Sequence, residues 1–77
     1  MEDLLNYLIK SIVDVEYEIE KQEYEGGVNF IIKLPKEVMG MVIGKEGKTI
    51  NAIRTLLKVR ATLEKVRANV ELQEKLA

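Results

Sequence analysis

The residues best suited to hold a ligand lie in one short segment, which reads Gly44-Lys45-Glu46-Gly47-Lys48-Thr49. Glycines let a ligand come close to the backbone N–H groups, and a helix beginning after the second glycine directs the positive end of its dipole toward them. The two lysines add two mobile positive charges. This combination predicts a site for an anion such as a phosphate group.

The end of this segment, Gly47-Lys48-Thr49, also matches the end of the phosphate-binding loop of nucleotide hydrolases. That motif needs a glycine five residues before Gly47, where this chain has Val42, and it follows a strand. The residues before the present loop are spaced as in a helix. The sequence therefore argues against a nucleotide hydrolase, and the phosphates of a nucleic acid strand are the better fit.

The composition argues against catalysis. The chain has 77 residues and contains no histidine, cysteine or tryptophan, so the commonest general base and the commonest transition-metal ligands are missing. We expect one domain over 1–77 that is not an enzyme and takes no metal, cofactor or small-molecule substrate. No apolar run reaches the roughly 20 residues that span a bilayer, and the acidic start does not suit a secretory signal. We expect a cytoplasmic protein without a membrane partner.

The charges are separated along the chain. The net charge of −1 comes from 12 basic and 13 acidic residues. Residues 1–25 carry a net charge of −6, whereas residues 26–77 carry +5. Such asymmetry between halves is a cue for polyanion binding by the basic half. The acidic residues lie in the first predicted helix and strand, away from the glycine-rich segment.

Hydrophobic periodicity predicts six elements. They are a helix over 3–13, strands over 15–20 and 28–34, helices over 36–43 and 48–61, and a strand over 66–72. Pro35 ends the second strand, because proline has no N–H to donate to a neighbouring strand. The order is helix, strand, strand, helix, helix, strand.

Two adjacent glycines in Glu25-Gly26-Gly27 predict the turn of a hairpin between the first two strands. A two-residue glycine turn would pair Ile19 with Leu34. It would also place Lys21 and Glu23 on the inner face. The hairpin tip then either extends beyond the core or contains a bulge, and the sequence leaves both possibilities open.

The segment Val42–Arg54 resembles the signature of the KH (K-homology) domain, Ile-Gly-x-x-Gly-x-x-Ile. The helix and two strands before it and the single strand after it resemble the type II arrangement. The leucine-rich first helix, Met39–Ile43 and Ala52–Thr55 are similar to the small bacterial KhpA (YlqC-like) RNA-binding proteins. The resemblance implies an α+β fold, in which helices pack on one face of a three-stranded sheet.

The resemblance also implies a function, which is to bind single-stranded RNA by clamping its backbone in the Gly-x-x-Gly loop. A KhpA-like protein would act as an RNA chaperone or post-transcriptional regulator. The implied RNA-binding residues are Ile43, Gly44, Lys45, Glu46, Gly47, Lys48, Thr49 and Arg54. The candidates for the wall of an apolar groove beside the loop are Val38, Met41 and Val42 from the helix and Ile31 or Ile32 from the strand.

The scarcity of aromatic residues favours this mode over domains that stack bases on exposed aromatic rings, because the chain has only four such residues and none flanks the loop. Two features temper the prediction. Glu46 places a carboxylate where it would repel phosphate. If the Glu25–Gly27 turn forms the other lip of the groove, it offers little contact area. We expect modest affinity and little sequence selectivity.

Other side chains have simpler explanations. Met39 and Met41 suit the core better than a ligand. A second basic group suits a solvated face better than a phosphate patch. Its members are Lys58, Arg60, Lys65 and Arg67.

Two alternative functions stay open at this point. The domain could serve mainly to dimerise, either with itself or with a larger KH-containing protein of the Jag type, which the resemblance implies as a partner. It could also be a relative of the KH domains that bind ribosomal RNA during ribosome assembly.

Overall fold

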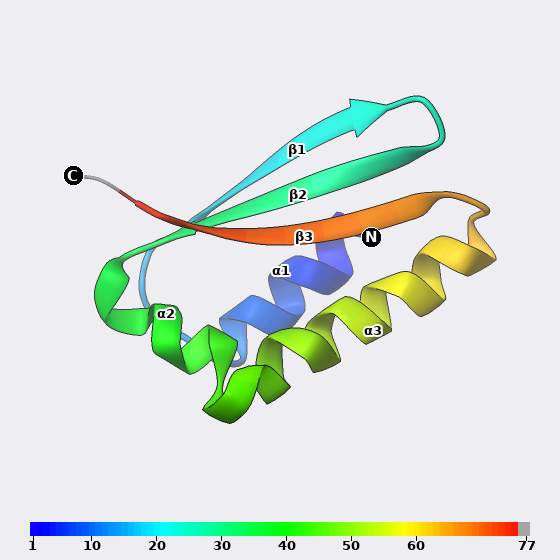
Figure 1. Ribbon diagram of the computed structural model, residues 1–77. Helices are drawn as coiled ribbons and strands as arrows, with labels where there is room; N and C mark the ends of the chain where they lie inside the picture. The colour runs from blue at the N-terminus through cyan, green and yellow to red at the C-terminus, as the bar shows by residue number, and fades with distance from the viewer. Residues whose placement is uncertain (76–77) are drawn as a thin grey trace.

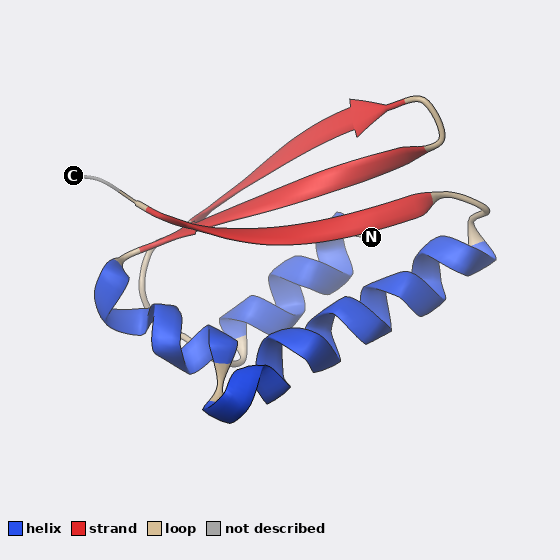
Figure 2. Ribbon diagram, viewed as in Figure 1, coloured by secondary structure: helices blue, strands red, loops and turns tan. Residues whose placement is uncertain are grey.

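The computed structural model describes residues 1–75, and the predicted domain extends two residues beyond them. Within this range, three helices lie on one face of a three-stranded sheet, as the coloured ribbon in Figure 2 shows. The elements are α1 (Glu2–Lys10), β1 (Glu18–Tyr24), β2 (Gly27–Leu34), α2 (Lys36–Ile43), α3 (Lys48–Leu63) and β3 (Arg67–Glu74) (Figure 1). The predicted fold class and element order are confirmed.

Strand β2 is the centre of the sheet and of the core. It pairs antiparallel with β1 and parallel with β3, because α2 and α3 carry the chain back to the start of the sheet before β3 begins. Its residues are alternately buried and half-buried, as expected for a strand with one covered face. Phe30, Ile32 and Leu34 are fully buried and meet Leu5 and Ile9 of α1 and the inner side of α3. Ile53, Leu57 and Ala61 form that inner side.

The hairpin turn is Glu25-Gly26 rather than Gly26-Gly27, since Tyr24 pairs with Gly27. The predicted pairing of Ile19 with Leu34 is therefore wrong by two residues, and Ile19 pairs with Ile32. A shift of two residues keeps the same side chains on the inner face. Gly26 has the positive φ, +86°, that the turn requires. At Gly27 a Cβ atom would lie 2.7 Å from both the Arg67 carbonyl oxygen and the Tyr24 hydroxyl, so this glycine provides space.

The first strand begins later than predicted. Residues before Glu18 have no partner on β2, because Glu18 pairs with Lys33 and β2 ends one residue later, just before Pro35. The preceding segment is irregular and is tied to α1 by the Tyr17 hydroxyl, which donates to the Asn6 carbonyl at 3.2 Å. Burial raises the pKa of that phenol. Strand β1 instead continues to Tyr24 with regular pairing, so the hairpin tip extends beyond the core without a bulge.

The remaining boundaries differ only slightly from prediction. Helix α2 has the predicted limits, whereas α1 ends three residues early and α3 continues two residues further. Strand β3 covers 67–74 rather than 66–72. The alternation predicted for β3 is confirmed, because Ala68 and Val70 are buried and Asn69 is exposed.

Arg54 fastens α3 to β3. Its Nε and Nη2 atoms donate to the Val70 carbonyl at 3.3 and 3.2 Å. This contact gives Arg54 a structural role, while its predicted contact with RNA stays a prediction.

A variant that keeps the aliphatic stem of Arg54 separates the two roles. Arg54→Met removes the hydrogen bonds to Val70, and we expect the free energy of unfolding to fall by about 1–2 kcal/mol in urea titrations. If the role is structural alone, the affinity for RNA changes less than about twofold. Unchanged stability with a large loss of affinity would instead place Arg54 in the RNA site.

Candidate nucleic-acid interface

The loop between α2 and α3 has a backbone conformation that requires glycine at its first position. Gly44 has φ 76° and ψ 172°, a region that is essentially restricted to glycine. A Cβ atom on Gly44 would lie 2.9 Å from the Thr49 backbone nitrogen and would overlap the Thr49 side chain. The fold therefore leaves no room for a side chain at this position.

The next residues turn sharply into α3. Glu46 (φ 58°, ψ 25°) and Gly47 (φ 75°, ψ 13°) are both left-handed, and the Gly47 N–H donates to the Gly44 carbonyl at 3.1 Å. Within residues 1–75, the N–H groups of Lys45 and Glu46 have no acceptor. No side chain in this range caps α3. Backbone donors and the positive end of a 16-residue helix are thus available at one place.

The charges around the loop are accessible. Lys45 and Lys48 are exposed, and neither forms an ion pair with any residue that the structure describes. Glu46 is also exposed, so its repulsion of a phosphate is screened by solvent and salt. The loop therefore offers backbone donors and a net positive charge, two features that suit a phosphate group.

The structure corrects the predicted groove wall. Val42 and Ile32 are fully buried in the core and cannot touch a base. Ile31 alternates with the buried residues of β2, so it points to the sheet face that the helices leave open. Val38 is half-buried, and Met41 is 54% exposed rather than core filler. Met39 is half-buried against the core, as predicted.

Sequence reasoning missed Gly40 as a part of this surface. It lies three and four residues before Ile43 and Gly44, so the three share one side of α2 next to the loop. Its position is exposed and a Cβ atom there would meet nothing within 4 Å. A glycine inside a helix costs about 1 kcal/mol relative to alanine, which is the signal that could have identified it.

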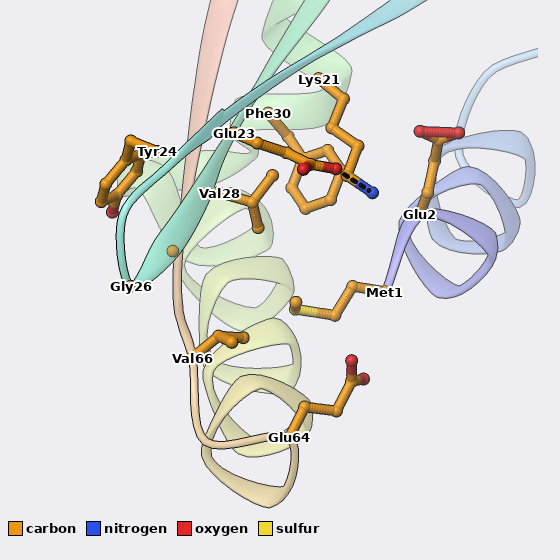
Figure 3. A pocket seen from close by; sticks show the side chains of 11 residues that line it. Met1, Glu2, Lys21, Glu23, Tyr24, Gly26, Val28, Phe30, Glu64 and Val66 are labelled. Atoms are coloured by element: carbon orange, nitrogen blue, oxygen red, sulfur yellow. Dashed lines mark ion pairs between the residues drawn. The ribbon is translucent and has the colours of Figure 1, made fainter.

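The Glu25–Gly27 turn lies at the other end of the molecule and does not form a lip beside the loop. The Gly26 carbonyl accepts a hydrogen bond from the Arg67 N–H, which follows the end of α3. An open pocket of about 340 Å³ lies at this end. Figure 3 shows Met1, Val28 and Phe30 among its lining residues. Lys21 and Glu23 pair at 3.2 Å on its rim, where Glu2 and Glu64 also lie. Because three carboxylates and only one lysine side chain line this pocket, its charge disfavours the binding of a phosphate group.

Comparison with known proteins agrees with this architecture. The family model described as "KhpA/KhpB, KH domain" matches residues 2–72, which include the complete loop and all of α2 and α3. The chain belongs to the KhpA/KhpB KH-domain family. The predicted resemblance is therefore confirmed.

Individual members of the KhpA/KhpB family are similar to this chain over nearly their whole length. The RNA-binding protein KhpA of Chlamydia caviae is 42% identical and the alignment covers 96% of this chain and 97% of that protein. The protein of the same name from Clostridium acetobutylicum is 40% identical, with 94% and 99% covered. That of Borreliella burgdorferi is 33% identical, with 91% and 88% covered.

No helix in residues 1–75 has the length and apolar character needed to cross a membrane. The same range contains no group of three or more side chains arranged to hold a metal ion.

Proposed function

We propose that this KhpA/KhpB family member binds single-stranded RNA, with the phosphates held by the loop from Gly44 to Gly47. The observation that carries this proposal is the loop itself. Among the residues that the structure describes, it combines N–H groups without an acceptor, two lysines without an ion pair and an uncapped helix N-terminus at one exposed place. The printed name of the relatives, RNA-binding protein, supports the same ligand.

The surface beside the loop favours a particular mode of binding. Met41 and Ile43 are exposed. Gly40 is also exposed and has no side chain, so the surface of α2 beside them is flat. Bases from an unpaired strand could lie against this apolar surface while the loop holds the backbone, whereas the bases of a duplex are stacked inside the helix. Contacts of this kind distinguish bases weakly, so we propose modest affinity and low sequence selectivity.

A titration of labelled RNA tests this function. Neutralising about two phosphates of a single strand gives a slope of about −1.4 in a plot of log affinity against log salt. The affinity should therefore fall about sevenfold between about 50 and 200 mM salt. A perfect duplex of the same length should bind more weakly than the single strand. Equal binding to both would argue against the proposed mode.

Glu46→Gln is expected to strengthen binding, since it removes the carboxylate nearest the proposed phosphate without changing the size of the side chain. We expect a rise in affinity of about two- to fivefold at low salt and a smaller one at high salt, because salt screens exposed charges. The matched control is Glu25→Gln, which removes the same charge at the hairpin turn and should have little effect. An equal rise in both variants would mean that only the net charge matters.

In the cell we propose a cytoplasmic role as an RNA chaperone or post-transcriptional regulator, without an enzymatic activity of its own. A second candidate function, dimerisation with itself or with a larger KH-containing protein of the Jag type, is favoured by exposed apolar residues on α3. Leu56, Val59 and Leu63 are 48%, 58% and 76% exposed.

A further inference from the structure

The open pocket of about 340 Å³ lies between the hairpin tip, the start of α1 and the end of α3. It forms because β1 and β2 extend beyond the helices at this end of the molecule (Figure 1). Lys21 and Glu23 are therefore exposed, although they lie on the inner face of β1. The glycine loop precedes α3 and lies at the other end of that helix. The pocket is thus separate from the proposed RNA site.

The floor of the pocket is apolar. Val28 and Phe30 of β2 are buried there, and the half-buried Met1 and Val66 lie beside them (Figure 3). Part of this apolar surface stays in contact with solvent. Removing such surface from water is favourable, so the floor suits the hydrocarbon part of a ligand.

Carboxylates from three different elements surround this floor. They are Glu2 of α1, Glu23 of β1 and Glu64, which follows α3. Within residues 1–75, Lys21 is the one basic side chain that lines the pocket, and it pairs with Glu23 at 3.2 Å. Neither Glu2 nor Glu64 forms an ion pair with any residue that the structure describes. Figure 3 shows these two on opposite sides of Met1, so negative charge without a partner lies on both sides of the floor.

Glu64 has no simple structural explanation. Glu2 lies in the first turn of α1, where a carboxylate stabilises the helix. Glu64 directly follows the last turn of α3, where the negative end of the helix dipole makes a carboxylate unfavourable. A cation in the pocket would be attracted by both the dipole and the carboxylate. The next basic residues, Lys65 and Arg67, are not among the lining residues.

We propose that this pocket binds an aliphatic diamine or polyamine. Two ammonium groups of the ligand pair with Glu2 and Glu64, and the methylene chain between them covers Met1 and Val66. The volume is at the lower end of the range for small-molecule sites. A metal ion fits less well, because hard cations need several oxygen ligands close together, and residues 1–75 contain no such group.

A titration of the RNA-free protein with diaminobutane, followed in a nitrogen-15 amide spectrum, tests this site. We expect the largest shifts at Val28, Glu64 and Val66. Glu64→Gln should weaken binding about three- to fivefold, because it removes one of the two ion pairs. The matched control Glu71→Gln removes the same charge from the open face of the sheet, beside Ile31, and should leave the affinity nearly unchanged. Equal weakening in both variants would overturn the proposal, since the diamine would then follow net charge alone.

Diamines of increasing length distinguish a pocket from a diffuse attraction to acidic residues. The series from diaminopropane to diaminohexane keeps the charge at neutral pH and adds methylene groups. We expect the affinity to rise roughly twofold for each added methylene until the chain covers the floor, because a methylene in an open pocket is only partly buried. The same affinity for every length would overturn the proposal, whatever the outcome of the RNA titrations. So would equal shifts at Glu64 and Val66 with magnesium chloride at the same ionic strength.

Discussion

Replacing both Gly44 and Gly47 with Asp is expected to lower the affinity for single-stranded RNA at least about 100-fold, while the domain stays folded. Each substitution places a carboxylate beside the proposed phosphate and alters the direction of the loop N–H groups. Losing two hydrogen bonds to a charged group corresponds to about 3 kcal/mol or more, which is a factor of about 100 in affinity. Fluorescence anisotropy measures the affinity, and circular dichroism verifies the fold.

The two glycines differ in what a side chain would meet. At Gly44 a Cβ atom overlaps Thr49, so Gly44→Asp also distorts the start of α3. At Gly47 the nearest atom is 3.8 Å away, so Gly47→Asp costs only the left-handed backbone strain of about 1 kcal/mol. The single Gly47→Asp variant is therefore the cleaner probe of binding.

Gly26→Asp is the matched control for these variants. It introduces the same charge and a similar strain at φ +86°, in open space at the far end of the molecule. We expect Gly26→Asp to bind RNA like the native protein. If it loses as much affinity as Gly47→Asp, the loss reflects net charge or stability and the loop is not the site.

Phe30→Ala is expected to have the largest effect on stability, lowering the free energy of unfolding by about 3–5 kcal/mol. Phe30 is fully buried on the central strand, where α1, α3 and the other two strands meet. Its removal leaves a cavity that the two covering helices cannot both close. Because small domains are only marginally stable, a large fraction of the variant would be unfolded at 37 °C.

Urea titrations followed by circular dichroism measure this loss. Tyr7→Ala is the matched control, because it also truncates an aromatic residue, but one that is 70% exposed on α1. We expect the control to change stability by less than about 1 kcal/mol. Similar losses in both variants would mean that the core is not organised around β2 as described.

Much of this fold follows from local patterns in the sequence. Helix α2 is bounded by Pro35 and Gly44, two residues with strong backbone restrictions, and its predicted limits are those of the structure. The inward residues of β2 and β3 alternate strictly, which identified the buried face of each strand. The loop could be predicted because its glycines, its lysines and the start of the next helix are adjacent in the sequence, so no tertiary contact is needed to bring them together.

Features that depend on tertiary packing could not be predicted in this way. Periodicity does not reveal which of two adjacent apolar residues faces the core, so it predicts Val42 beside Met41 in the groove, although Val42 is fully buried. The hairpin register depends on whether Gly27 is part of the turn or is the first residue of β2, where it leaves room for the Tyr24 side chain. The acceptor of Arg54 lies 16 residues away on another element. Local sequence carries no signal for such a contact.

The most direct measurement of the central claim is a nitrogen-15 amide spectrum of the protein titrated with a short single-stranded RNA. We expect the largest shifts at the amides from Ile43 to Thr49 and on the exposed side of α2 around Gly40. The amides of the hairpin turn around Gly26 should stay unchanged. Shifts concentrated on the open sheet face or at the hairpin end, with the loop unaffected, would contradict the proposal that the loop binds RNA.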